Sequence, residues 1–394
     1  MLNALLTGVV VGALALALFT AVGYPALLRF RARGRRYPIE GVLAAADASY
    51  AANTPLSFPT VTAVIATRER PTVIADRVRD LRTADFPQDR FDVIVAVDAS
   101  SAHSPTEYEA VLAGEARVVV GDQPGGKAAA LNAGVRASTG DVLLFADSAQ
   151  QFAHTTVRDL VISLSAENVG AVSGVIAPAA DDPLLDRYWQ YELGLRRYQT
   201  RIHSIICVSG AVYAMRRALW RPMPHTLICD DLFATTQVVL QGWRVAICER
   251  ALATDPREFT REQHFRRKVR TLTGLVQLCA WTPEILVPWR NAGWLDLVIH
   301  KLTRVLLPYI ALAAAIAGGW LAIRLGGTIV VWAAGILVLL ALGVVAVKPA
   351  IARQVAWVAR LSTAPVLALW NAVRGRWGVW QRQPGTVTPP VVVD

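Results

Sequence analysis

Three sets of side chains in this sequence suit the steps of one reaction. Asp147 directly follows the apolar run 142–146, a pattern that predicts a short buried strand delivering an acid to the edge of a sheet. Two adjacent acids, Asp230 and Asp231, come later in the chain, and an arginine-rich block follows at 257–270. An acid that holds a metal and a diphosphate, an acid that accepts a proton, and cations that neutralise a leaving group favour sugar transfer from a nucleotide diphosphate.

The region around Asp147 is predicted to alternate between strands and helices. Strands are expected at 60–66, 91–97, 116–120 and 140–146, and helices at 71–82 and 127–138. This alternation favours an α/β fold with parallel strands and helices on both faces of the sheet. Ligands bind beyond the carboxyl ends of such strands, and polar residues stand at those ends here. They are Thr67, Glu69, Asp98 and Asp147.

The segment 121–127 fits the pattern G-x-x-x-x-G-K of phosphate-binding loops. That loop needs Ser or Thr directly after the lysine to bind magnesium, and Ala128 cannot do so. Two interpretations remain for Lys127: an exposed lysine in a turn before a helix, or a lysine that reaches a nucleotide from a loop beside the site.

Long uncharged stretches divide the chain, which has 394 residues and a hydrophobic fraction of 54%. Residues 2–28, 305–323 and 325–347 carry no charge, and each could cross about 30 Å of hydrocarbon as a helix. The expected domains are a transmembrane helix at 1–28, a basic linker at 29–58, a cytosolic catalytic domain at 59–282, an amphipathic interfacial region at 283–304, two transmembrane helices at 305–347, and an interfacial helix with a basic tail at 348–394.

Arginines flank the first apolar stretch on its carboxyl side, from Arg29 to Arg36, and none precedes it. This arrangement disfavours a cleaved signal peptide and places the following domain in the cytosol, on a multi-pass protein of the inner membrane. The net charge of +10 suits an anionic leaflet, and no nucleic-acid motif suggests another partner. Segment 361–373 is uncharged but short, which favours an interfacial helix over a fourth span. The four cysteines lack metal-type spacing and are expected to be free thiols.

Several motifs occur in an order that resembles glycosyltransferase family 2, whose members have the Rossmann-like GT-A fold. Segment 126–134 reads GKAAALNAG, like the GK-x-x-AL-N-x-G motif of that family, and 147–149 occupies the place of its D-x-D motif. The other matches are 98–101 to the D-x-S loop, 208–211 to the acceptor segment, 229–231 to the T/E-D-D element, and 263–267 to the Q-x-x-R-W motif. The last motif is typical of the membrane-embedded branch that makes cellulose, hyaluronan and chitooligosaccharides.

The resemblance implies a role for each matching residue. The nucleotide of a UDP-sugar or similar donor is expected to contact Thr67, Glu69, Asp98, Lys127 and Asp147. Asp147 is expected to bind Mg²⁺ or Mn²⁺. Asp231 is the expected general base of an inverting transfer, with Asp230 as the alternative base or as a group that positions the acceptor. Ser209 and Gly210 are expected at the acceptor, and Gln263, Arg266 and Arg267 over the diphosphate.

Two residues depart from the family pattern. Ala149 replaces the second acid of D-x-D, and Arg267 replaces the tryptophan of Q-x-x-R-W. The expected acceptor is a hydroxyl of a carbohydrate or lipid-linked sugar, with membrane lipids as partners. Transfer to a polyprenyl phosphate and a catalytically silent nucleotide-sugar-binding protein remain as alternatives. Structural alternatives also remain: Asp230 and Asp231 suit the start of a helix at 232–241, and the basic block suits lipid headgroups.

Overall fold

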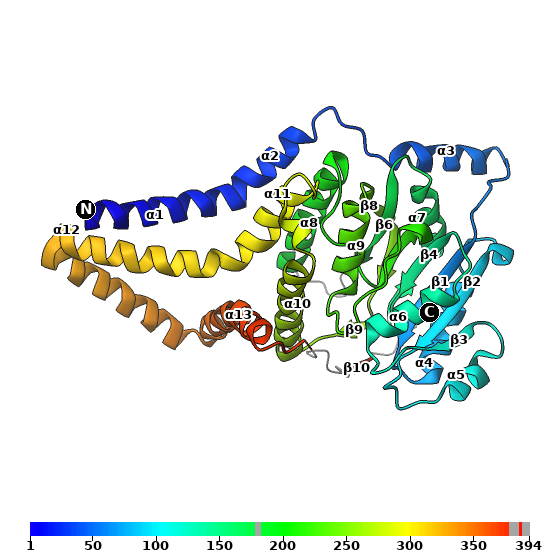
Figure 1. The fold of residues 1–394 in the computed structure, drawn as a ribbon. Helices are drawn as coiled ribbons and strands as arrows, with labels where there is room; N and C mark the ends of the chain where they lie inside the picture. The colour runs from blue at the N-terminus through cyan, green and yellow to red at the C-terminus, as the bar shows by residue number, and fades with distance from the viewer. Residues whose placement is uncertain (178–182, 378–385, 388–394) are drawn as a thin grey trace.

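The computed structural model of the protein describes residues 1–177, 183–377 and 386–387. Its centre is an eight-stranded sheet with the order β3-β2-β1-β4-β7-β6-β8-β5 (Figure 1). The strands are β1 (Val61–Thr67), β2 (Phe91–Val97), β3 (Arg117–Val120), β4 (Val142–Ala146), β5 (Gln151–Phe152), β6 (Val169–Ala177), β7 (Val212–Arg216) and β8 (Arg244–Thr254). A separate small pair consists of β9 (Arg257–Glu258) and β10 (Thr386–Val387).

Helices cover the sheet and extend away from it. Those of the sheet domain are α3 (Glu40–Ala51), α4 (Pro71–Arg82), α5 (Pro105–Leu112), α6 (Lys127–Ala137), α7 (Thr156–Leu164), α8 (Pro183–Ile202), α9 (Asp230–Leu240) and α10 (Arg261–Trp281). The flanking ones are α1 (Leu2–Leu18), α2 (Tyr24–Arg31), α11 (Trp294–Asp296), α12 (Arg304–Val347) and α13 (Pro349–Val373). Short 3₁₀ turns lie at Gln88–Arg90, Arg217–Leu219 and Pro283–Leu286, and π-helical turns at Phe19–Gly23 and Leu297–Thr303.

The first four strands are parallel, as the sequence pattern predicts. Val61 of β1 lies opposite Phe91 of β2 and Val142 of β4, and Val97 lies opposite Val120 of β3. The rest of the sheet differs from a parallel arrangement, because β7 runs antiparallel to both β4 and β6. The sheet is therefore mixed. An apolar run indicates a buried strand but does not indicate its direction.

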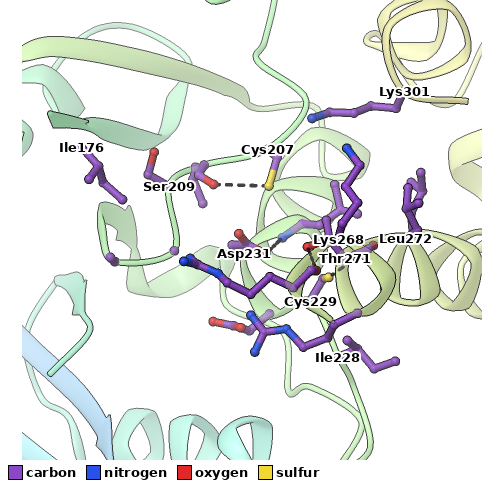
Figure 2. Close-up of a pocket in the computed structure, with 18 of the residues that line it drawn as sticks. Ile176, Cys207, Ser209, Ile228, Cys229, Asp231, Lys268, Thr271, Leu272 and Lys301 are labelled. Carbon is purple, nitrogen blue, oxygen red and sulfur yellow. Dashed lines mark hydrogen bonds between the residues drawn. The ribbon is translucent and has the colours of Figure 1, made fainter. Parts of the chain in front are cut away.

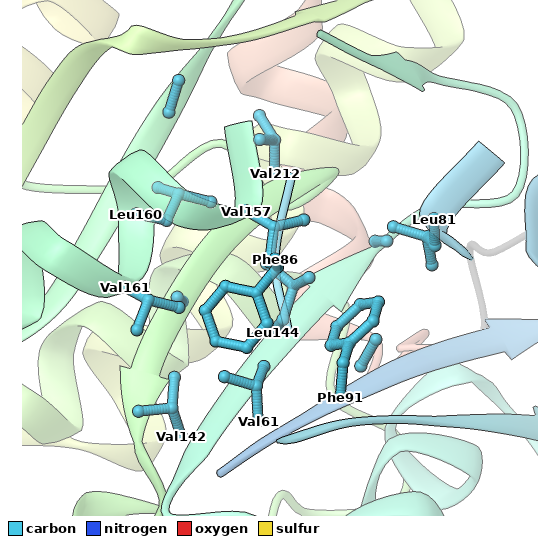
Figure 3. Packing of buried hydrophobic residues seen from close by; sticks show 14 of the residues in the cluster. Val61, Leu81, Phe86, Phe91, Val142, Leu144, Val157, Leu160, Val161 and Val212 are labelled. Carbon is cyan, nitrogen blue, oxygen red and sulfur yellow. The ribbon is translucent and has the colours of Figure 1, made fainter. Parts of the chain in front are cut away.

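Alternate residues of each parallel strand enter two separate cores. On one face, Val61 and Ile65 pack with side chains from α4, α5 and α7 (Figure 3). On the other face, Val64 packs with side chains from α6, α9 and α10. Because both faces are covered, the central strands β1, β2 and β4 are almost continuously apolar and buried, whereas the edge strand β3 is partly exposed. The expected layer of helices on each side of the sheet is thus present.

Two helical stretches, Leu2–Arg31 and Val305–Gly327, are long and apolar enough to cross a membrane by length and composition. Figure 1 shows α1 lying alongside the first part of α12, away from the sheet. The chain reverses inside α12 at Gly327, whose φ of 59° is a backbone conformation that favours glycine. The third expected span, 325–347, is helical here, but most of its side chains lie outside the described residues, as do residues 378–385 and 388–394 of the expected tail.

The segments on either side of α12 differ from their predictions. Residues 283–304 do not form one amphipathic helix, because a 3₁₀ turn, the short α11 and a π-helical turn follow one another before α12 begins. Leu297 and His300 of this segment are buried against the domain. The tail helix α13 is longer than 361–373, and its Ala364 and Ala368 pack against α10.

A chain of buried polar side chains joins α2 to the domain. The Tyr24 hydroxyl donates to the Asp296 Oδ1 atom at 2.7 Å and accepts from the Gln199 Nε2 atom at 3.0 Å. Gln199 also lies 3.3 Å from Nδ1 of His300, whose Nε2 atom is 3.0 Å from the Glu192 Oε2 atom. Tyr24, Gln199 and His300 are almost completely buried, so the amino-terminal helix is packed tightly onto the rest of the molecule.

Candidate active site

The strand order brings the predicted polar residues to one edge of the sheet. Strand β1 lies between β2 and β4 and is parallel to both, so their carboxyl ends are neighbours. Thr67 ends β1, Asp98 follows β2, and Asp147 follows β4. Such an edge collects side chains from separate parts of the sequence at one place.

Lys127 lies between two of the acids that were expected to share a site with it. Its Nζ atom is 3.0 Å from the Asp147 Oδ1 atom and 3.0 Å from the Asp230 Oδ2 atom. Burial alone would lower the pKa of Lys127, but the two carboxylates raise it above its usual value. The ammonium is therefore charged at every physiological pH. Lys127 is neither a solvent-exposed turn residue nor part of a complete phosphate-binding loop.

Asp98 supports the turn that carries Lys127. Its Oδ1 atom accepts from the Ser100 amide at 2.9 Å, both of its oxygens accept from the Gly126 amide at 3.0 Å, and Oδ2 accepts from the Arg68 Nε atom at 2.6 Å. Burial opposes ionisation, but these hydrogen bonds lower the pKa of Asp98. Only 2% of Asp98 is exposed. This geometry favours a supporting role over the expected direct contact with a nucleotide base.

Gly125 and Gly126 fit closely around Asp98 in this turn. Their φ angles are 95° and 109°, and a Cβ atom on Gly125 would lie 2.6 Å from the Asp98 Oδ1 atom. Glycine is required here by both conformation and space. The other two expected nucleotide ligands lie beside this turn: the Thr67 hydroxyl accepts from the Glu69 amide at 2.9 Å, and Thr67 itself is buried.

Asp230 and Asp231 are the first two residues of α9, which begins earlier than the expected 232–241. Neither is the N-cap, because Cys229 occupies that position. Asp231 accepts from the Leu232 amide at 2.8 Å. Burial, together with the neighbouring charge of Asp230, raises the pKa of Asp231 above its usual range. Asp231 is therefore a stronger base than an ordinary aspartate when it is ionised.

Gly210 packs directly against Asp231. A Cβ atom at this position would lie 3.1 Å from the Asp231 Cβ atom and 3.4 Å from its Oδ2 atom. The backbone there is held by the Ser209 amide, which donates to the Ser173 hydroxyl at 2.9 Å. The expected acceptor segment and the expected base are therefore in contact.

Substituting Gly210 by alanine is expected to move the Asp231 carboxylate by a few tenths of an ångström. We expect kcat to fall about 10-fold, because a misplacement of 1 Å can cost on the order of 100-fold. The measurement is kcat with thermal unfolding of the same samples. Gly194→Ala is the matched control, since a Cβ atom at Gly194 of α8 meets no atom within 4 Å. An equal loss of activity in both variants would contradict this role for Gly210.

A cavity of about 630 Å³ opens beside these acids (Figure 2). Its lining contains seven of the expected site residues and a set of side chains from other segments. The expected ones are Lys127, Asp147, Ser209, Gly210, Asp230, Asp231 and Arg267. The others with charge are Glu192, Arg196, Asp255, Arg257, Lys268, Arg270 and Lys301. Thr67, Glu69, Asp98, Gln263 and Arg266 lie outside this lining.

Helix α10 shows why only part of the Q-x-x-R-W-like motif reaches the cavity. Arg267, Thr271 and Leu275 recur every four residues on one face of the helix and line the cavity. Gln263 lies at the start of the helix, where its side chain and Thr260 form a capping box. Arg266 instead pairs with Glu262 at 2.8 Å and is largely exposed. Of the three residues expected over a diphosphate, Arg267 therefore lines the cavity, whereas Gln263 and Arg266 lie outside its lining, and contact with a diphosphate stays a prediction.

Three further residues, Arg77, Gln150 and Asp255, were not identified from the sequence. Buried Arg77 donates from its Nε atom to the Asp147 carbonyl at 3.1 Å, which fixes the backbone after β4. Asp255 accepts from the Gln150 Nε2 atom at 2.8 Å and pairs with Arg257 at 2.8 Å. A helical spacing places Arg77 on the buried face of α4, but no local pattern indicates which strand end it contacts.

The residues present allow a divalent metal only with help from a ligand. Ala149 provides no oxygen, and in the described residues no three His, Cys, Asp or Glu side chains form a metal-binding group. Asp147 is the acid that would hold the ion, because it lines the cavity and is partly exposed. Mg²⁺ commonly takes one or two carboxylates and completes its shell with phosphate oxygens and water. The site fits that mode of binding.

The described structure is thus an α/β domain with acids and cations gathered at the carboxyl edge of its parallel strands. Residues 62–221 match the family model described as Glycosyl transferase family 2. The matched stretch includes Lys127, Asp147, Ser209 and Gly210, while the Asp230–Asp231 pair follows it. Among curated proteins, no sequence matches this chain.

The fold extends the similarity beyond that domain. A mannosyltransferase from Pyrobaculum calidifontis, solved in complex with GDP-Man and Mn²⁺, covers 94% of this chain and 99% of its own at 20% identity, with a TM-score of 0.65. Glucosyl-3-phosphoglycerate synthase from Mycobacterium tuberculosis, in complex with Mg²⁺ and UDP, covers 56% of this chain and 80% of its own at 19% identity, with a TM-score of 0.40. The first comparison shows a shared GT-A-like fold across the sheet domain and its flanking helices.

Proposed function

We propose that the protein is a membrane-bound, inverting glycosyltransferase that uses a nucleotide-sugar donor. The observation that carries this proposal is the position of the Lys127 ammonium, 3.0 Å from Asp147 and 3.0 Å from Asp230, in a cavity that Asp231 also lines. The family match at 62–221 supports the reaction class. The mannosyltransferase of similar fold was solved with GDP-Man and Mn²⁺, which supports a nucleotide-sugar donor and a divalent ion.

The donor diphosphate would lie at the polar end of the cavity. Lys127, Arg257 and Arg267 line this end, and burial together with neighbouring arginines lowers the pKa of Arg267. Lys127 and Arg257 also pair with acids of the cavity, whereas Arg267 lies near the cations Arg257 and Arg270, an arrangement that favours an anion. Guanidinium groups bind phosphate oxygens in pairs. A divalent ion bound at Asp147 would neutralise charge on the departing diphosphate.

Asp231 would accept the proton of an acceptor hydroxyl. The oxygen attacks the anomeric carbon as the bond to the diphosphate breaks, and the nucleotide leaves with the electron pair. A single displacement of this kind inverts the configuration and needs no covalent nucleophile. The raised pKa of Asp231 suits a base that works near neutral pH. Ser209 and Gly210, which lie beside Asp231, would border the acceptor.

Attachment to the cytoplasmic membrane is proposed from the helices. The stretches Leu2–Arg31 and Val305–Gly327 are long and apolar enough to span it. Arginines between residues 29 and 36 follow the first stretch and would face the cytosol with the sheet domain. The exposed apolar side chains of α13, among them Val366 and Trp370, suit an interfacial helix.

The test is nucleotide release by the purified full chain in detergent, with a panel of UDP- and GDP-sugars and either Mg²⁺ or Mn²⁺. We expect release with at least one donor and loss of release in Asp147→Ala. The catalytically silent alternative predicts nucleotide binding without turnover for any donor. The phosphate-binding-loop alternative predicts ATP consumption that Lys127→Ala abolishes.

A polyprenyl phosphate is a second candidate acceptor. The observation that favours it is that the helices α12 and α13 themselves line the cavity, at Pro308 and Leu361 among others. A phosphate is already an anion and needs no base. Asp231→Asn should therefore be tolerated with such an acceptor but not with a hydroxyl acceptor.

A further inference from the structure

A buried hydroxyl joins the segment 208–211 to the helix that carries Asp231. Thr235 of α9 is 1% exposed, and its Oγ1 atom accepts from the Val208 amide at 3.0 Å. The same oxygen donates to the Asp231 carbonyl at 2.8 Å. The Thr235 side chain thus connects the segment expected at the acceptor with the peptide group of the expected base. Thr235 lies outside the motifs found in the sequence and outside the family match at 62–221.

The bond from Thr235 to Asp231 would be ordinary by itself. A threonine in a helix often donates to the carbonyl four residues earlier, as Thr273 of α10 does to Val269 at 2.9 Å. The bond from Val208 is different, because it comes from a segment between α8 and β7 that lies 27 residues earlier in the chain. The hydroxyl uses its proton for Asp231 and a lone pair for Val208, so both groups fix its orientation.

The segment 208–211 depends on side chains to hold its backbone, because it belongs to neither a helix nor a strand. The Val208 amide donates to Thr235, and the Ser209 amide donates to the Ser173 hydroxyl at 2.9 Å. Ser173 is completely buried in β6. A buried amide that loses its acceptor is unfavourable, so the two hydroxyls hold the segment in one position. Ser173 attaches the segment to the sheet, whereas Thr235 attaches it to α9.

The position of this segment determines the surroundings of the Asp231 carboxylate. A Cβ atom on Gly210 would lie 3.4 Å from the Asp231 Oδ2 atom, so the segment packs directly against that oxygen. Ser209, Gly210 and Asp231 line the same cavity (Figure 2). If the segment moved away from α9, water would reach the carboxylate and an acceptor would lose the surface beside the base. The rate of a transfer depends strongly on such alignment.

Resting on the proposed function, we propose that Thr235 is a positioning residue that holds the segment 208–211 against Asp231, so that an acceptor hydroxyl lies within reach of the base. Thr235 itself does not line the cavity. It acts through Asp231 and Gly210 and takes part in no bond of the transfer. The proton of the acceptor hydroxyl still passes to Asp231, and the nucleoside diphosphate still leaves with the electron pair.

The test is Thr235→Val, which keeps the shape of the side chain and removes its hydroxyl. Nucleotide release from UDP- and GDP-sugars is measured with the purified full chain in octyl glucoside, whose hydroxyls and those of water serve as acceptors. We expect kcat to fall about 10-fold, because a misplacement of 1 Å can cost on the order of 100-fold. The affinity for UDP or GDP should be unchanged, since Lys127 and Asp147 keep their contact.

The pH–rate profile separates this role from a purely structural one. Burial raises the pKa of Asp231, so water admitted by a displaced segment should lower that pKa toward its ordinary value. The base then stays ionised to a lower pH, and the acid limb of the profile should move to lower pH in Thr235→Val. The substitution leaves in place the other titratable groups that interact with Asp231, which are Asp230, Lys127, Cys207, Cys229 and Tyr213.

Two further variants serve as controls. Thr235→Ser keeps the hydroxyl and should retain most of the activity. Thr273→Val is the matched control, because Thr273 is completely buried, donates to Val269, accepts from the Asn371 Nδ2 atom at 3.4 Å and lies outside the cavity lining. It should lose thermal stability without a change in kcat or in the acid limb. If Thr235→Val does not fold, Thr235→Cys replaces it, since a thiol is only a weak donor and acceptor.

An unchanged kcat or an unmoved acid limb in Thr235→Val, or in Thr235→Cys where that variant replaces it, would overturn this role and leave the proposed function standing. The same loss of activity in Thr273→Val would also overturn it, because the effect would then follow stability alone. So would a loss in Thr235→Ser as large as that in Thr235→Val. Absence of nucleotide release by the unmodified chain with every donor would overturn the proposed function itself, and this inference with it.

Discussion

Asp231→Asn is expected to lower kcat with a hydroxyl acceptor by a factor of about 100 or more, the usual contribution of a positioned general base. The amide keeps the size of the side chain and can still accept from the Leu232 amide, so α9 should remain folded. Donor binding should be unchanged, because Lys127 contacts Asp230 and Asp147 rather than Asp231. Steady-state kinetics together with nucleotide binding by the same variant test both expectations.

The acid limb of the pH–rate profile should reveal the same residue. Because burial and Asp230 raise the pKa of Asp231, the base becomes protonated at a higher pH than an ordinary aspartate. The rate should therefore fall as the pH drops through that raised pKa. Asp76→Asn, at an exposed position on α4, is the matched control and should leave kcat and the profile unchanged. Full activity of Asp231→Asn with a hydroxyl acceptor would contradict the assignment.

Lys127→Met is expected to weaken donor binding about 10- to 100-fold, since a charge-assisted hydrogen bond contributes about 1.5–3 kcal/mol. The loss has two physical sources. The cation that would meet the diphosphate is removed, and the Asp147 and Asp230 carboxylates lose the ammonium that lies between them. Like charges left together repel each other and any incoming phosphate.

Nucleotide titrations and thermal unfolding measure this second prediction. Lys348→Met removes the same charge outside the cavity and should bind the donor normally. Lys127→Arg should restore part of the affinity because it restores a cation. Unchanged nucleotide affinity in Lys127→Met would show that the Lys127 ion pairs are only structural.

The parallel half of the sheet was predictable because its strands are continuous apolar runs with polar ends. The predicted strand 91–97 matches β2 at both ends, and the predicted helix 71–82 matches α4. The direction of β7 was not predictable, since it depends on which strands it lies between and not on its own residues. The local sequence pattern therefore predicts which segments form strands and helices, whereas the neighbouring strands determine the direction of a strand in the sheet.

Site residues were predictable where they belong to motifs that occur in a recognisable order. They were not predictable where their position depends on contacts with segments distant in the sequence. Lys127, Asp147 and Asp231 line one cavity as expected. Asp98, like Asp147, is an aspartate directly after a parallel strand. Its carboxylate, however, is buried and accepts hydrogen bonds from the amides of Ser100 and Gly126. The sequence near Asp98 does not indicate this contact, because Gly126 is 28 residues away in the sequence and the fold brings it to Asp98.

The cations of the cavity show the same limit. A run of arginines and lysines indicates positive charge but not the face on which each residue lies, and one step along α10 separates exposed Arg266 from Arg267 in the cavity. Lys301 and Arg196 stand apart from that run, in segments whose local pattern suggested membrane contact or no role. Only the packing of α8 and α12 against the domain brings them to the site.

The hydrogen bonds of Tyr24 have a practical consequence for work on a soluble form. A chain shortened to begin at residue 37, in order to remove the apolar amino-terminal helices, lacks Tyr24. It therefore loses the hydroxyl that donates to Asp296 and accepts from Gln199. Asp296 would then keep a buried carboxylate with one fewer donor, and Gln199 and His300 would each lose a contact with Tyr24. His300 lies beside Glu192 in the cavity wall. Trimming the leading helix should thus yield a domain whose chemistry is impaired even where its sheet is intact.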